Sequence, residues 1–342
     1  MFRVNMMSKA DIVKGHGVLS AHDEQVSLVR NELYDVFEVV ENGKIPCDII
    51  HYHSINPELF LHARRHKQQG STVGSVHFLP ETVEDSIYLP GIAKKAFYKY
   101  MLSFYQCMDH LVTVNPYFIQ ALMNYGISKE KVTYIPNFVS EEVFYPLSES
   151  RKKETRKFYQ LPTEAFTILC AGQMQKRKGV MEFIKIARNM PGFQFVWAGG
   201  FSFGKISDGY DEIKTVMSHA PQNVKFLGMI DREKMNEIYN MADVMFLPSF
   251  EELFPMTILE AMNCSIPILV RDLDIYKPIL YDYVIKGKSN EEFQRILIRL
   301  MEDENFYQMA SQAAFSGHQF YSRKHVSDMW REFYLGIVES NI

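Results

Sequence analysis

The chain has 342 residues, of which 47% are hydrophobic and 23% are charged, and its formal net charge is −4. The length favours two domains, and the composition is that of a folded globular protein. The slight negative charge argues against generic binding of nucleic acid. No apolar run approaches the roughly 18–20 residues that span a bilayer, so any membrane contact is expected to be peripheral.

Four cysteines lie far apart in the chain and match neither the spacing of a metal site nor that of a redox pair. They are Cys47, Cys107, Cys170 and Cys264. We expect them to be reduced, mostly buried thiols of a cytosolic protein.

Short apolar segments alternate with amphipathic ones along the whole chain, which predicts a parallel-sheet α/β architecture. In the first half, helices are expected over 20–33 and 57–69. The expected strands of this half are 2–6, 48–53, 72–77, 110–114 and 132–135. A charged stretch with two prolines, 146–163, is expected to be a surface linker that leads into a helix.

A second α/β series follows this linker. Its expected strands are 165–172, 194–198, 224–227, 244–247 and 267–270, with a helix over 180–189 after the first of them. The last segment, 325–338, has the pattern of an amphipathic helix rich in aromatic residues.

The most informative segment covers residues 242–262. A buried strand ends at Pro248, and a helix begins around Pro255, so the loop between them leads into a helix N-terminus. Free backbone N–H groups and the helix dipole make such a terminus an anion site. Glu252 and Glu260 flank this terminus, and each can accept hydrogen bonds from sugar hydroxyls. The pattern predicts a nucleotide sugar whose diphosphate lies at the helix end.

A glycine-containing, cationic loop follows the first strand of the second half. It reads Gly172-Gln173-Met174-Gln175-Lys176-Arg177-Lys178-Gly179. Glycine allows close approach of the backbone to a ligand, and the cations neutralise phosphate charge. Alone, the loop could be a solvated turn; together with Glu252 and Glu260 it favours a diphosphate site.

These two motifs resemble those of the retaining glycosyltransferases of family 4, which have the GT-B fold. The resemblance covers almost the whole chain and is most specific at 172–179 and 242–267. It implies an α/β protein with two Rossmann-like domains, whose parallel sheets face a cleft, and a C-terminal helix that crosses back to the first domain.

The expected first domain is 1–146, joined by the C-terminal helix at about 322–342. By the resemblance it binds the acceptor and the membrane, and the second domain, 147–321, binds the nucleotide sugar. Pro136-Asn137, followed by Phe144 and Pro146, resembles the hinge segment of the family, although Phe138 and Ser140 replace its glycine and aspartate.

The resemblance also implies roles for single residues. Lys178 neutralises the leaving diphosphate, Glu252 binds a hydroxyl of the transferred hexose, and Glu260 binds the ribose. Gln173 occupies the position of the usual arginine, and Arg177 is the candidate for the missing charge. The expected catalytic residues are His77, Lys178 and Glu252. The expected donor-binding residues are Gly15, Gly17, Gly172, Gln173, Arg177, Lys178, Gly228, Phe254, Pro255, Met256, Thr257 and Glu260.

His77 ends a predicted strand and matches the histidine that the family places beside the sugar; the alternative is a surface histidine with no role. No metal is expected, because Lys178 and helix ends can carry the phosphate charge. Two motifs that could suggest a metal site are not expected to bind one. His51 and His53 have no third ligand nearby in the sequence, and Asp272-Leu273-Asp274 is expected to be a solvated loop. The expected donor is UDP-hexose, without a cofactor.

The segment 91–105 has an apolar helical face with lysines beside it, which is the pattern of a helix at a membrane surface. The alternative is an ordinary helix packed on the first sheet. The residues expected to contact an anionic membrane are Lys94, Lys95, Phe97, Lys99, Tyr100 and Phe104.

Within the family, both motif variants resemble enzymes that extend bacterial membrane glycolipids. The implied activity is transfer of galactose or glucose from UDP-hexose, with retention, to a glycolipid such as monoglucosyl-diacylglycerol at the cytoplasmic face of the cell membrane. One alternative is a glycosyltransferase of a soluble or polyprenyl-linked saccharide in cell-surface polysaccharide synthesis. The other is a catalytically silent GT-B binding partner, which Lys178, Glu252 and Glu260 argue against and Gln173 keeps open.

Overall fold

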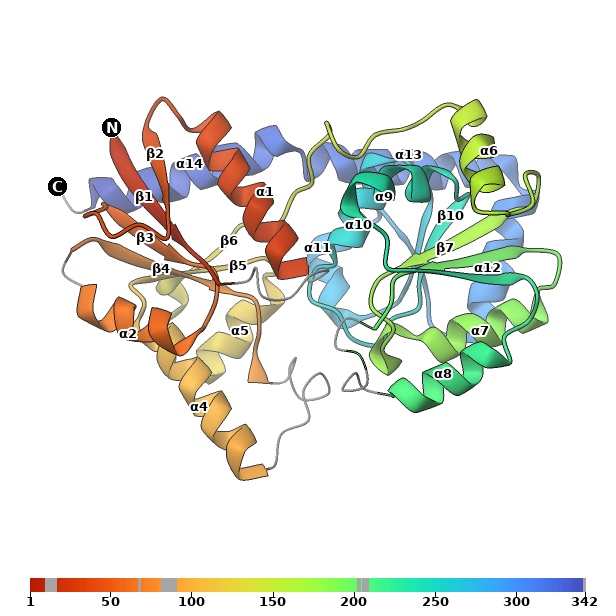
Figure 1. The fold of residues 1–342 in the computed structure, drawn as a ribbon. Coiled ribbons are helices and arrows are strands. Elements are labelled where there is room, and N and C mark those ends of the chain that lie inside the picture. The colour runs from red at the N-terminus through yellow and green to blue at the C-terminus, as the bar shows by residue number, and fades with distance from the viewer. Residues whose placement is uncertain (10–16, 67–68, 81–90, 202–203, 205–208, 341–342) are drawn as a thin grey trace. The chain divides into compact units, whose positions relative to one another are not determined.

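A computed structural model describes residues 1–9, 17–66, 69–80, 91–201, 204 and 209–340. The chain forms two compact units (Figure 1). The first contains Met1–Phe138 and Arg323–Ile342, and the second contains Val139–Ser322. The second unit therefore begins before the expected position at residue 147. The N–H groups of Tyr145 and Leu147 donate to Asn236 Oδ1 (3.1 Å) and Asn240 Oδ1 (2.7 Å), which fixes this part of the connecting segment to the second unit.

In its described part, the first unit contains a six-stranded parallel sheet with the order β2-β1-β3-β4-β5-β6. The strands are β1 (Phe2–Met7), β2 (Phe37–Glu41), β3 (Ile49–Tyr52), β4 (Ser71–Val76), β5 (His110–Thr113) and β6 (Val132–Tyr134). The helices are α1 (Gly17–Glu32), α2 (Pro57–His66), α4 (Gly91–Cys107), α5 (Tyr117–Asn124), the 3-10 helix η2 (Lys129–Lys131) and α14 (Arg323–Glu339). Helices α1 and α14 cover one face of the sheet, and α2, α4 and α5 lie on the other side (Figure 1).

The second unit has the same design, and its described part contains a six-stranded parallel sheet with the order β12-β11-β10-β7-β8-β9. The strands are β7 (Thr167–Ala171), β8 (Gln194–Ala198), β9 (Val224–Gly228), β10 (Val244–Leu247), β11 (Ile268–Arg271) and β12 (Ile285–Gly287). The helices are α6 (Glu149–Phe158), η3 (Lys176–Lys178), α7 (Val180–Asn189), α8 (Tyr210–Ser218), α9 (Arg232–Asn240), α10 (Met256–Asn263), η5 (Asp274–Tyr276), α11 (Lys277–Leu280), α12 (Asn290–Glu302) and α13 (Glu304–Phe320).

A largely buried charge cluster fixes α6 to the N-terminal edge of the second sheet. Asp243 precedes β10 and accepts hydrogen bonds from the backbone N–H of Thr167, Arg156 Nη2 and Lys152 Nζ at 2.6–2.7 Å. Arg156 is 4% exposed and also donates to two backbone carbonyls. Because every charge in the cluster has a partner, its burial does not leave an unpaired ion.

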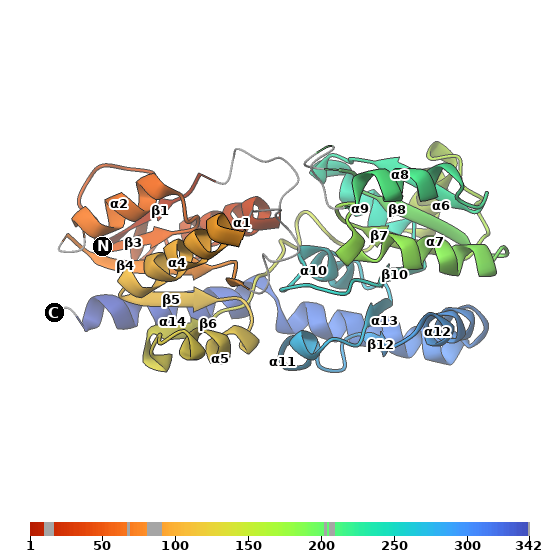
Figure 2. The same cartoon turned by 90° about the horizontal axis from the view of Figure 1, so that it is seen from below.

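Helix α14 belongs to the core of the first unit although it comes last in the chain. Its residues Val326, Trp330 and Tyr334 are buried against Leu28 of α1 and Ile49 of β3 within one hydrophobic cluster. Figure 2 shows this helix lying lengthwise against the first unit. Among the described residues, no helix is both long and apolar enough to cross a membrane.

Trp330→Ala should lower the free energy of unfolding of the first unit by about 3–5 kcal/mol, because it removes a buried aromatic side chain and leaves a cavity. Chemical denaturation, followed with probes in each unit, measures the effect. Glu332→Ala is the matched control, since Glu332 is exposed on the same helix. Equal stabilities of the two variants would show that α14 is not a structural part of this core.

Candidate functional site

Two loops meet at the C-terminal ends of the adjacent strands β7 and β10. The N–H of Phe250 donates to the carbonyl of Arg177 (2.7 Å), and Arg177 Nη1 donates to the carbonyl of Glu251 (3.2 Å). Gly179 has φ +74°, and a Cβ at this position would lie 2.6 Å from the carbonyl oxygen of Pro248. Glycine is therefore required for the loops to approach this closely.

The two loops place Lys178 and Glu252 together as a buried ion pair. Lys178 Nζ lies 2.5 Å from Glu252 Oε1, and the side chains are 13% and 5% exposed. Burial lowers the pKa of Lys178, and the carboxylate of Glu252 opposes this change. The sequence motifs assigned separate ligands to these residues, whereas the structure makes each the partner of the other. A diphosphate can replace Glu252 beside Lys178 and release the carboxylate for a sugar hydroxyl.

Helix α10 begins directly after the second loop. Pro255 is its N-cap residue, so Met256 and Thr257 lie in the first turn, where N–H groups have no acceptor within the helix. Phe254 is 4% exposed, and its ring packs at 5.1 Å from that of Tyr321, so its side chain belongs to the core. The expected donor-binding role of Phe254 can then involve only its backbone.

Glu260 lies in the second turn of α10 and is 6% exposed. Tyr239 Oη donates to its Oε2 (2.6 Å), and Arg232 Nη1 donates to its Oε1 (2.9 Å). Sequence reasoning missed Arg232 and Tyr239, because nothing in the local pattern connects α9 with α10.

The remaining donor residues of the second unit lie at strand ends. Gly172 follows β7 with φ +147°, and Gly228 ends β9 with φ +71°. Gln173 is half-buried beside Gly172. The guanidinium of Arg177 donates to a backbone carbonyl, so in this structure it holds the two loops together.

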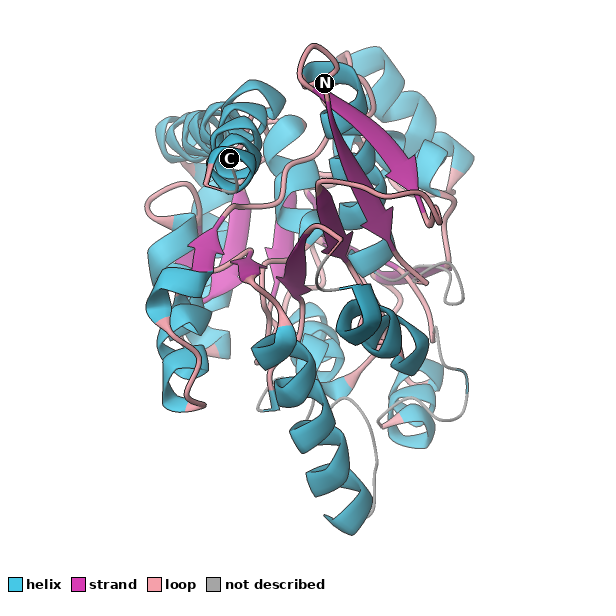
Figure 3. Cartoon of the chain, turned by 90° about the vertical axis from the view of Figure 1, so that its left-hand side faces the viewer, coloured by secondary structure: helices cyan, strands magenta, loops and turns pink. Residues whose placement is uncertain are grey.

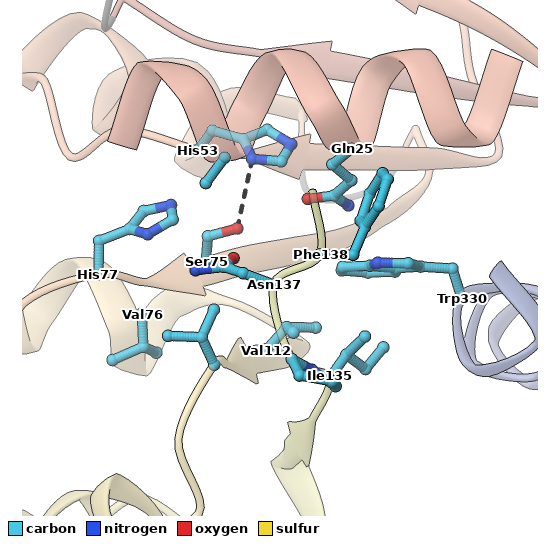
Figure 4. A pocket seen from close by; sticks show the side chains of 13 residues that line it. Gln25, His53, Ser75, Val76, His77, Val112, Ile135, Asn137, Phe138 and Trp330 are labelled. Atoms are coloured by element: carbon cyan, nitrogen blue, oxygen red, sulfur yellow. Dashed lines mark hydrogen bonds between the residues drawn. The ribbon is translucent and has the colours of Figure 1, made fainter. Parts of the chain in front are cut away.

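In the first unit, His77 follows β4 and lines a small pocket at the C-terminal ends of β3, β4 and β5 (Figure 4). His53 and Ser75 lie on its polar side, with Ser75 Oγ 3.4 Å from His53 Nδ1. The other side is apolar and includes Val112, Ile135, Phe138 and Trp330. The cavity has a volume of about 20 Å³. That volume is the size of one or two water molecules.

Behind the pocket, a hydrogen-bonded network joins α14 to the sheet. His51 Nδ1 lies 2.7 Å from Tyr334 Oη, and His51 Nε2 lies 2.9 Å from Ser75 Oγ. Burial, together with neighbouring histidines, lowers the pKa of His51 and His53 well below the ordinary value. These histidines therefore remain neutral. Within the described ranges, no group of three or more His, Cys, Asp or Glu side chains could hold a metal ion.

Two further expectations concern the first unit. Gly15 lies outside the described residues, and Gly17 is the first residue of α1.

Helix α4 extends beyond the sheet at its N-terminal end (Figure 3), where Ile92 is 88% exposed.

The apolar face of α4 is exposed to solvent near its N-terminus and packs into the core near its C-terminus. Lys95 and Lys99 are exposed and Phe97 is half-buried. Phe104 is fully buried, and Tyr100 is half-buried, with its hydroxyl donating to the carbonyl of Ile55. We therefore remove Phe104 and Tyr100 from the candidate membrane surface.

Comparisons with known proteins agree with this architecture. A family model described as "Glycosyltransferase Family 4" matches residues 29–143, and one described as "Glycosyl transferases group 1" matches residues 151–316. The alpha-galactosylglucosyldiacylglycerol synthase of Streptococcus pneumoniae is 41% identical over 97% of this chain and 89% of its own length. A processive diacylglycerol alpha-glucosyltransferase of Acholeplasma laidlawii is 26% identical over 61% of this chain and 62% of its own.

Solved structures show the fold. Anabaena HepE in complex with UDP-glucose superposes with a TM-score of 0.79 at 14% identity, covering 98% of this chain and 100% of that one. The sucrose-phosphate synthase of Thermosynechococcus elongatus has a TM-score of 0.79 at 14% identity, with coverage of 99% and 100%. The fold is thus GT-B, and the similarity to the Streptococcus pneumoniae synthase together with the two family models shows that the protein is a glycosyltransferase. It belongs to glycosyltransferase family 4. The expected family, fold class and enzyme class are confirmed.

The buried histidines predict how stability depends on pH. Since the pKa of His51 and His53 is lowered by folding, only the unfolded chain takes up their protons near pH 6. Stability is then complete above the ordinary pKa of about 6.5 and falls as the pH drops below it. Between pH 7.5 and 5.5 we expect a loss of about 2–3 kcal/mol from the two groups.

Denaturation of the first unit at both pH values measures this loss. His51→Gln should reduce the loss to about half, because one titrating group remains. An unchanged free energy of unfolding in the wild type between the two pH values would contradict the assignment.

Proposed function

We propose that this protein transfers a hexose, galactose or glucose, from UDP-hexose to a membrane glycolipid such as monoglucosyl-diacylglycerol, with retention of configuration. The observation that carries the donor assignment is the buried Lys178–Glu252 pair beside the N-terminus of α10. The acceptor assignment is supported by two relatives, of which one is named as an alpha-galactosylglucosyldiacylglycerol synthase and the other as a processive diacylglycerol alpha-glucosyltransferase. In this proposal the second unit binds the donor, and the first binds the acceptor and the membrane.

The donor chemistry follows from charge. The diphosphate takes Lys178 from Glu252 and lies at the free N–H groups of α10. Glu252 then accepts a hydrogen bond from a hydroxyl of the hexose, and Glu260 accepts hydrogen bonds from the ribose hydroxyls. His77 of the first unit stays a proposed catalytic residue. The bond between the anomeric carbon and the phosphate oxygen breaks, and the acceptor oxygen bonds to that carbon on the same face. The acceptor proton passes to the departing diphosphate.

This reaction depends on stabilising a leaving anion more than on a side-chain base. Because Lys178 and the α10 N-terminus supply positive charge at that position, we propose that no metal ion is required. Activity of the wild type should therefore persist in EDTA. Loss of activity in EDTA that returns with added magnesium would contradict this part of the proposal.

Lys178→Ala should reduce kcat by at least about 100-fold, since it removes one preorganised partner of the leaving group. Transfer of labelled hexose to extracted lipid acceptor measures the effect. Lys185→Ala is the control, because Lys185 is exposed on the adjacent helix α7. A kcat within threefold of the wild type in Lys178→Ala would exclude the proposed role.

Membrane binding is the second element of the proposal. The N-terminal turns of α4 present Ile92, Lys95 and Lys99 as exposed residues, with Lys94 and Phe97 half-buried beside them. Each lysine near an anionic surface contributes roughly 1 kcal/mol, so three give about 3 kcal/mol, or over a hundredfold in partitioning. The attraction should weaken as salt rises. We propose that the enzyme is cytoplasmic and binds peripherally to the inner face of the cell membrane.

The triple variant Lys94/Lys95/Lys99→Glu should lose binding to anionic vesicles by at least about a hundredfold. Sedimentation with anionic and with neutral vesicles measures binding. The control Lys157/Lys185/Lys234→Glu makes the same change in net charge at exposed lysines of the second unit. Equal binding by the two triple variants would show that α4 is not the anchor.

The two alternatives can also be tested. Absence of wild-type binding to any vesicle would favour a soluble or polyprenyl-linked saccharide as the acceptor. Absence of hexose transfer with intact UDP-hexose binding would favour a silent binding partner. The glycolipid-synthesising relatives favour neither alternative.

A further inference from the structure

Glu260 receives both of its described side-chain hydrogen bonds from a neighbouring helix. Tyr239 Oη donates to Oε2 (2.6 Å), and Arg232 Nη1 donates to Oε1 (2.9 Å). The two donors are seven positions apart on α9, which places them on the same face of the helix, two turns from each other. Each oxygen of the carboxylate therefore has one fixed donor.

Both donors are supported by one aromatic ring. The guanidinium of Arg232 lies 5.2 Å from the centroid of Phe144, and the ring of Tyr239 packs edge-on at 5.8 Å from the same ring. Phe144 is 1% exposed. It belongs to the hinge-like segment that the sequence singled out and that the proposed donor chemistry does not use.

The segment around Phe144 is itself fixed to α9. Asn236 and Asn240 accept from the N–H groups of Tyr145 and Leu147, and Asn240 Nδ2 donates to the carbonyl of Tyr145 at 2.9 Å. The ring of Phe144 is therefore held against the face of α9 that carries Arg232 and Tyr239.

These contacts leave Glu260 able to bind a ligand. An ionised carboxylate has about four acceptor positions, and Tyr239 and Arg232 use two of them. Burial and the adjacent carboxylate raise the pKa of Tyr239, so its hydroxyl remains a donor. Arg232, whose side chain is 37% exposed, offsets the charge of Glu260, which would otherwise repel the diphosphate of a bound nucleotide.

We propose that Tyr239 and Arg232 are positioning residues that orient Glu260 toward the ribose hydroxyls of the donor, and that Phe144 positions both of them. The inference rests on the proposed role of Glu260 in ribose binding. It gives the connecting segment a function in nucleoside recognition, in addition to joining the two units.

The test compares the affinities of UDP and its 2′-deoxy and 3′-deoxy analogues by calorimetry on the full chain. Wild type should prefer UDP to at least one analogue by about tenfold, because a buried carboxylate loses a charge-assisted hydrogen bond. Tyr239→Phe keeps the ring and removes the hydroxyl, and it should reduce this preference to about threefold or less. The KM for the donor should rise with kcat nearly unchanged.

Control variants separate positioning from folding. Tyr307→Phe removes the hydroxyl of another tyrosine of the second unit, on α13, and should keep the full preference. Arg232→Gln at the partly exposed second donor should reduce the preference as Tyr239→Phe does, and Arg232→Lys should restore part of it. Phe144→Leu should also reduce the preference for UDP over its deoxy analogues, by a smaller factor than Tyr239→Phe.

The outcomes distinguish the positioning role of Tyr239 and Arg232 from the proposed binding of ribose by Glu260. If Glu260→Gln removes the preference for UDP while Tyr239→Phe and Arg232→Gln keep it at tenfold, the positioning role is wrong and the role of Glu260 stands. If Glu260→Gln also keeps the preference, Glu260 does not bind the ribose, and the inference falls with it.

Discussion

The close approach of the loops after β7 and β10 is the constraint on which the candidate site depends. Parallel strands end at a common edge, so the segments that follow β7 and β10 are neighbours. They pack in contact because Gly179 has no Cβ that would strike the carbonyl of Pro248. This contact determines the positions of Lys178, Glu252 and the N-terminus of α10. A change in that backbone contact would displace all three.

The Lys178–Glu252 pair explains how a buried cation persists before a substrate arrives. An isolated buried ammonium would lose its proton or its position, since removing a charge from water costs several kcal/mol. Glu252 satisfies the ammonium until a diphosphate replaces it. The buried carboxylate of Glu260 is likewise satisfied, by hydrogen bonds from Arg232 and Tyr239. Each charged side chain that the proposed reaction uses is thus paired, before a substrate arrives, with a residue that leaves it able to bind the substrate.

Sequence reasoning reached the alternation of strands and helices and the strand–loop–helix at 242–262, because these depend on local periodicity and turn residues. It missed β2 at Phe37–Glu41, a short half-exposed strand at the edge of the sheet. It also missed the pairing of Lys178 with Glu252 and the contacts of α9, which tertiary packing alone creates. The sequence predicts membrane contact for Phe104, which the structure buries, because an apolar helical stripe has the same pattern whether lipid or a sheet covers it.

The placement of α14 has a consequence for the order in which the protein folds during synthesis. The second unit is continuous in sequence, so all of its strands and helices emerge from the ribosome before Arg323. The first unit lacks Trp330 and Tyr334 from its core until the last helix is made. The sheet synthesised first therefore keeps part of one face uncovered, namely the part that α1 does not cover, while the unit synthesised second can complete its core. Chaperone binding to nascent chains should accordingly concentrate on the face of β1 and β3 that α14 later covers.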